Sequence, residues 1–134
     1  MNGELMGQPA THTVQAKWIL NHRFLEIHEC GPPDPKTAKP QYEAMPMIGC
    51  DNLSERYVVH RIDVFGRRFS ETLGCGKRVG SQIDFIFEYP DSPFRTNFIW
   101  DATRGEWHCQ MTQKNTSGQW TTFADLTLSQ TEHD

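Results

Sequence analysis

The chain has 134 residues and a formal net charge of -4 at pH 7, from 13 Lys plus Arg against 17 Asp plus Glu. A chain of this length is most simply one domain, spanning residues 1–134, that folds without metal or disulfide staples. The acidic balance argues against nucleic-acid and membrane partners, and no apolar run is long enough for a transmembrane helix. The start MNGELMGQPATHT lacks the basic and apolar parts of a secretory signal, so we expect a cytoplasmic location.

In chain order, residues 1–10 are expected to form a flexible amino terminus. Residues 11–18, THTVQAKW, then alternate between apolar and polar side chains, and the turn-like LNHR leads into FLEIHEC at residues 24–30. This pattern predicts a β-hairpin. The following segment 31–40, GPPDPKTAKP, contains four prolines, which cannot donate hydrogen bonds to a ladder, so it is predicted to be an exposed loop.

The rest of the chain reads as seven more strands separated by short turns such as DNLSE and CGKRVGS, with residues 129–134 as a tail. Many short strands without intervening helices indicate an all-β, antiparallel, up-and-down barrel or a sandwich of about nine strands. Closure into a barrel is favoured because an open meander would leave two edges exposed. The seven strands are predicted at residues 42–50, 56–63, 68–74, 82–89, 94–101, 106–113 and 119–128.

Three neighbouring strands predict one continuous apolar wall. In each of them the large apolar side chains recur at every second position, while the intervening positions are mostly polar. We expect this wall to face an enclosed interior. It comprises Ile83, Phe85, Phe87, Tyr89, Phe94, Phe98, Trp100, Trp107, Cys109 and Met111.

The stretch 47–66, MIGCDNLSERYVVHRIDVFG, joins two predicted strands through a short turn. Asp and Asn side chains bond their own backbone, so the turn residues need no chemical role. In the second strand, alternation separates His60 from Arg61 and Asp63. If Val58 and Ile62 face inward, His60 does too, and Arg61 and Asp63 lie outside.

The run WILNHRFLEIHE, followed by GCDNLSERYVVHRIDVFG, resembles the bacterial domain-of-unknown-function family numbered fifteen seventy-nine. The resemblance implies a calycin-like, lipocalin-related β-barrel with no established reaction. Such domains begin with a G-x-W strand, which this chain lacks, so a missing strand completed by a partner chain, most simply in a homodimer, is expected. The matching positions are Trp18, Arg23, Phe24, Leu25, Gly49, Asp51, Asn52, Tyr57 and Asp63, with Cys50 in place of the usual tyrosine.

No motif predicts a metal, a cofactor or a catalytic residue. His28, His60 and His108 lie on strands without close ligand spacing, and a haem role would rest on fold analogy alone. Asp84 and Glu88 share a face but are about 13 Å apart along a strand. No G-x-S-x-G motif occurs.

The four cysteines, Cys30, Cys50, Cys75 and Cys109, form no C-x-x-C pair and are expected to be reduced, small apolar core residues. The basic pairs at residues 67–68 and 77–78 would be separated by up to roughly 30 Å along an extended strand, which argues against one nucleic-acid site.

The leading functional hypothesis is the binding of a small apolar or amphipathic ligand inside the barrel, because barrels of about eight or more strands can enclose one. A small enzyme acting on a hydrophobic substrate, with His60 as acid or base, is an alternative. A structural or oligomerisation barrel with no ligand is another. The residues expected to line a ligand are Trp18, His60, Phe85, Phe87, Phe98, Trp100, Trp107 and Met111.

Overall fold

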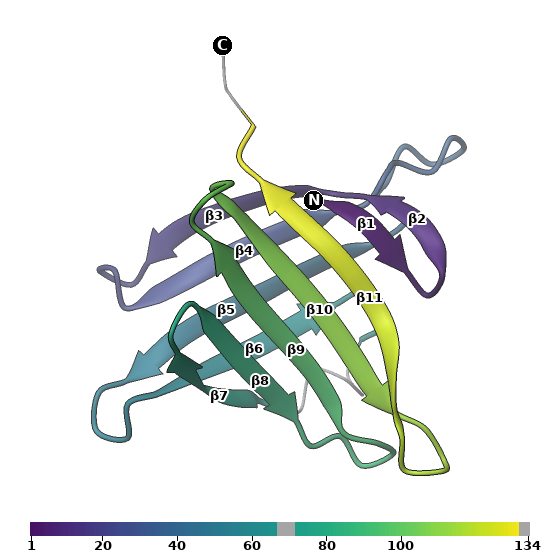
Figure 1. The fold of residues 1–134 in the computed structure, drawn as a ribbon. Helices are drawn as coiled ribbons and strands as arrows, with labels where there is room; N and C mark the ends of the chain where they lie inside the picture. Colours follow the sequence, from purple (N-terminus) through teal and green to yellow (C-terminus); the bar gives the residue numbers. More distant parts are fainter. Residues whose placement is uncertain (67–71, 132–134) are drawn as a thin grey trace.

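The computed structural model describes residues 1–66 and 72–131, which form one antiparallel sheet of eleven strands (Figure 1). The described part of the chain contains no helix that is long and apolar enough to cross a membrane. The strands are β1 (Asn2–Leu5), β2 (Gln8–Thr11), β3 (Thr13–Ile19), β4 (Phe24–Cys30), β5 (Glu43–Asp51), β6 (Arg56–Asp63), β7 (Gly74–Val79), β8 (Gln82–Phe87), β9 (Phe94–Asp101), β10 (Glu106–Lys114) and β11 (Trp120–Ser129).

The sheet curls into a nearly closed barrel because its two end strands are consecutive in the chain. The strand order is β2-β1-β11-β10-β9-β8-β7-β6-β5-β4-β3, and His12 alone separates β2 from β3. One extended segment therefore pairs with β1 through its first part and with β4 through its second part. Beyond His12, β3 diverges from the end of β11, and residues of both strands line the cavity of about 710 Å³ between them.

The all-β, antiparallel barrel expected from the sequence is confirmed, but the sheet has eleven strands rather than about nine. The expectation of a flexible segment 1–10 is wrong, because β1 inserts between β11 and β2. Four-residue strands are too short to show clear alternation. A Cβ atom on Gly3 (φ 155°) would lie 2.0 Å from the Asp125 carbonyl oxygen, so glycine is what permits this close pairing.

Of the strand predicted at residues 68–74, residues 68–71 lie outside the described part of the chain, and Gly74 begins β7. β7 occupies much of the CGKRVGS segment, which was expected to be a turn. A Cβ atom on Gly76 would lie 2.2 Å from the Asp84 carbonyl oxygen of β8. Gly76 thus allows a close approach between β7 and β8, whereas Gly80 (φ 60°) lies in the turn that joins them.

The turn between β5 and β6 is stabilised locally, as its residue types indicate. The Asp51 carboxylate accepts hydrogen bonds from the Leu53 backbone N–H at 3.1 Å and from the Ser54 hydroxyl at 2.6 Å. These bonds lower the pKa of Asp51, the Ser54 bond having the largest effect. The structure therefore confirms the local explanation of this turn.

The predicted apolar wall forms the core of the barrel. Phe85, Phe87, Cys109 and Met111 are buried within two clusters on the inner face of β8 to β11. Trp107 belongs to the same inner face but is 39% exposed, since it lies near the β9–β10 turn at the far end of the strand. The wall is thus dense at its centre and open at that end.

The orientation expected for β6 is wrong. Val59 is 4% exposed and packs with Phe85 and Phe87, so Arg61 and Asp63, at alternate positions after Val59, share its inner face. His60 pairs with Met47 on the outer face, and Ile62 is 37% exposed. Alternation correctly divided the residues of β6 between two faces. Hydrophobicity could not identify the inner face, because that face carries an arginine and an aspartate.

The cysteines occupy different environments. Cys109 is a buried core residue as expected, whereas the expectation is wrong for Cys50 and Cys75, which are exposed. Burial raises the pKa of the Cys109 thiol to about 12, which keeps this thiol protonated and unreactive.

In native protein isolated without reductant, Cys50 and Cys75 are therefore expected to react rapidly with a thiol reagent, and Cys109 only after denaturation. All four thiols should titrate in denaturant, as a reducing compartment predicts. Mass spectrometry of the labelled peptides measures both results. Rapid native labelling of Cys109, or fewer than four thiols in denaturant, would contradict this prediction.

Candidate functional site

A cavity of about 500 Å³ lies inside the barrel, toward the end that carries the β1–β2 turn and the β8–β9 loop. Its walls are largely apolar side chains from β1, β8, β9, β10 and β11, and its size falls within the range typical of small-molecule sites. The apolar lining residues are Leu5, Met6, Phe65, Phe87, Phe94, Met111, Phe123 and Leu126.

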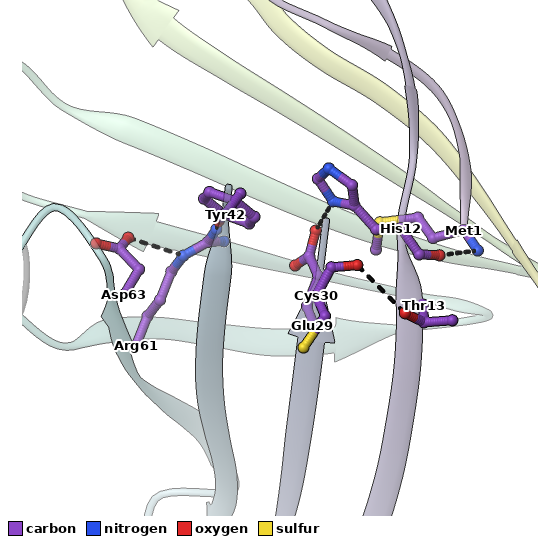
Figure 2. A network of polar contacts seen from close by, with 8 residues as sticks. All are labelled: Met1, His12, Thr13, Glu29, Cys30, Tyr42, Arg61 and Asp63. Atoms are coloured by element: carbon purple, nitrogen blue, oxygen red, sulfur yellow. Dashed lines mark hydrogen bonds and ion pairs between the residues drawn. The ribbon is translucent and has the colours of Figure 1, made fainter. Parts of the chain in front are cut away.

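One side of this cavity is polar. Figure 2 shows Arg61, Asp63 and Tyr42 together, with Glu29 and His12 beside them. Arg61 donates a hydrogen bond from Nη2 to the Tyr42 hydroxyl, and its Nε lies 3.6 Å from Asp63 Oδ2. The Arg61 and Asp63 side chains are 17% and 8% exposed, so this ion pair is largely removed from solvent.

His12 and Glu29 extend the polar cluster toward β2 and β4. His12 Nδ1 lies 2.6 Å from Glu29 Oε1, and both side chains are 6% exposed. The imidazole ring stacks on the Tyr42 ring with centroids 5.2 Å apart. The segment that joins β2 to β3 thereby fixes the position of Tyr42, which stands at the end of the β4–β5 loop.

The negative partners of this cluster keep Arg61 ionised, and burial above all keeps Tyr42 neutral. Burial, assisted by Glu29 and Asp63 and opposed by Arg61, raises the pKa of Tyr42 to about 12. Although burial lowers the pKa of Arg61, the neighbouring Tyr42, Glu29 and Asp63 together hold it above its usual value. A permanently charged donor and a hydroxyl group therefore face an apolar cavity.

Two of the residues expected to line a ligand, Phe87 and Met111, line this cavity. Phe85 and Phe98 pack in the core beside it, and His60 lies on the outer face. The three expected tryptophans do not line the cavity. They lie toward the ends of their strands that are away from it, with Trp18 58%, Trp100 37% and Trp107 39% exposed.

Sequence reasoning missed Glu29, Tyr42, Arg61 and Asp63 as cavity residues. Arg61 and Asp63 share the alternation of Val59, and Glu29 that of Leu25 and Ile27, so periodicity carried a usable signal. Tyr42 begins the strand predicted at residues 42–50 and shares the alternation of Ala44 and Ile48, so it carried the same signal.

A second polar group lies on the outer face, where His28 and Cys30 of β4 meet Glu43 of β5. One ligand atom from each residue lies within 4.8 Å of the others, so these residues could hold a metal ion.

Searches of family models, curated proteins and solved structures found no match for this chain. The resemblance to the family numbered fifteen seventy-nine, and the calycin relationship it implies, therefore stay predictions. Fold and site together define the class: an all-β, antiparallel, nearly closed barrel with an apolar cavity and a buried polar cluster on one wall.

Proposed function

We propose that the barrel binds a small amphipathic ligand in the cavity of about 500 Å³. The observation that carries this proposal is the division of the cavity into an apolar wall and one buried polar cluster, in which Arg61 and Tyr42 are hydrogen-bond donors. Burial of apolar ligand surface contributes about 25 cal/mol per Å², and a few polar groups then fix the orientation of the ligand.

The ligand's apolar body packs against Phe87, Phe94 and Phe123, and its polar head lies at Arg61 and Tyr42. Arg61 has five N–H donors, of which Nη2 contacts Tyr42 and Nε faces Asp63. The head group is accordingly a hydrogen-bond acceptor, with a carboxylate the best partner for a guanidinium group.

A fluorescent fatty-acid-like probe is expected to bind the purified chain with a stoichiometry of one. Leu5→Trp, which adds a bulky ring to the cavity lining, should weaken probe binding by at least about tenfold, because filling the cavity removes the space for the probe. Leu53→Trp is the matched control, since Leu53 lies on the β5–β6 turn and is 97% exposed.

Probe fluorescence titrations with wild type and both variants measure this effect. Absence of binding by the folded wild type, or equal affinity of all three chains, would overturn the proposal and favour a barrel without a ligand.

We also propose that the chain forms a homodimer through β3. This strand ends the sheet order, and its Trp18 is 58% exposed. Edge strands that are left uncovered present unpaired N–H and C=O groups, which a second copy can pair across a two-fold axis. β1 and β2 already supply the amino-terminal strands of the sheet. The edge with which a partner chain pairs is therefore that of β3.

Sedimentation at micromolar concentration is expected to give a dimer for wild type and a monomer for Trp18→Lys, which places a charge at the paired edge. Val79→Lys, at a 70% exposed position on β7, is the control and should remain dimeric. A monomeric wild type would refute this assembly.

A further inference from the structure

The outer face of β4 and β5 carries a histidine, a cysteine and a glutamate in contact. Glu29 points into the barrel, so its neighbours His28 and Cys30 lie together on the outer face. Glu43 is the direct partner of Cys30 in the β4–β5 ladder. His28 Nε2 lies 2.6 Å from Glu43 Oε1 and 3.4 Å from Cys30 Sγ.

These distances approach those of a metal centre. Tetrahedral zinc, with bonds of about 2.0 to 2.3 Å to nitrogen, oxygen and sulfur, places its ligand atoms roughly 3.3 to 3.6 Å apart. The separation of 3.4 Å between His28 Nε2 and Cys30 Sγ already has this value. The hydrogen bond of 2.6 Å between His28 and Glu43 must widen by about 0.7 Å, which small side-chain rotations supply.

We propose that His28, Cys30 and Glu43 bind one Zn²⁺ ion, with water in the fourth position. Imidazole and thiolate suit this borderline ion, whereas Mg²⁺ and Ca²⁺ prefer oxygen ligands throughout. The His28 and Glu43 side chains are 36% and 42% exposed, so the ion has a path from solvent and an open side for water.

Metal binding exchanges protons for the cation at this site. Zn²⁺ takes the place of the Cys30 thiol proton, which is released to solvent, and the Glu43 carboxylate supplies a second negative charge to the cation.

The proposed ion would link β4 to β5 at the two ends of the loop between them. Cys30 and Glu43 flank the loop of residues 31–42, whose ends are also joined by the Gly31 N–H to Tyr42 carbonyl hydrogen bond of 2.8 Å. The ion ties β4 to β5 at the base of the loop that delivers Tyr42 to the interior. It should therefore raise the melting temperature by several degrees, because it binds the folded chain and not the unfolded one.

Titration of the reduced, metal-free full chain with Co²⁺ tests the proposal. A thiolate-to-cobalt charge-transfer band should appear, saturate at one ion per chain and disappear when Zn²⁺ is added. Because loss of an outer-shell partner alone weakens metal sites by about 10- to 100-fold, Cys30→Ser and His28→Gln are each expected to weaken binding at least about 100-fold. Cys30→Ser should also abolish the band.

Cys75→Ser removes an exposed cysteine of β7 and is the matched control, expected to keep the band and the affinity. Circular dichroism confirms that each variant is folded. No band with the folded wild type, or a band that survives Cys30→Ser, would overturn the site. The result is independent of ligand binding in the barrel, because Co²⁺ alone is the probe.

Discussion

A chain carrying Arg61→Met is expected to bind the carboxylate probe about 10- to 100-fold more weakly than wild type, because a hydrogen bond to a charged group contributes about 1.5 to 3 kcal/mol. The same change should have a smaller effect on a neutral alcohol of equal chain length. Fluorescence titration with both probes gives the two ratios. Arg95→Met is the control, since Arg95 lies on the outer face, 3.2 Å from Asp84.

Loss of Arg61 also leaves Asp63 buried without its cationic partner, which destabilises a fold by about 3 to 5 kcal/mol. The double variant Arg61→Met/Asp63→Leu removes both charges and is expected to be more stable than the single variant while still failing to prefer the carboxylate. Wild-type affinity for the carboxylate probe in the folded double variant would show that Arg61 does not receive the head group.

Replacement of Phe85 by alanine is expected to lower the free energy of unfolding by about 3 to 5 kcal/mol. Phe85 is 1% exposed and meets Phe98 edge to face, with ring centroids 6.1 Å apart, so its loss leaves a void that the barrel cannot fill. Denaturant unfolding followed by circular dichroism measures the change, with an unaltered slope as the sign of two-state behaviour.

Trp107→Ala is the comparison, because Trp107 belongs to the same predicted wall as Phe85 but is 39% exposed. It is expected to destabilise the fold by less than half as much, since less surface is removed from water. A larger effect for Trp107→Ala than for Phe85→Ala would mean that the dense part of the core lies at the tryptophan end of the barrel, contrary to the structure.

Several features could be predicted from the sequence because their causes are local. Alternation over seven or more residues defined the faces of the longer strands, and the short polar segments between them defined turns such as that at Asp51, whose carboxylate binds its own loop. The inward placement of Phe85, Phe87 and Met111 followed from the same periodicity.

The tertiary structure decided what periodicity leaves open. It showed that residues 2–5 and 8–11 form strands, since Gly3 can approach Asp125 closely only once β11 is in place. It also reversed the expected orientation of β6. An inward Arg61 is stable because Asp63 and Tyr42 meet it there, and Tyr42 arrives from a distant loop. Alternation grouped Arg61 and Asp63 with Val59 but could not tell which face of β6 lies inside, because Tyr42, which accepts the hydrogen bond from Arg61 there, is 19 residues away in sequence.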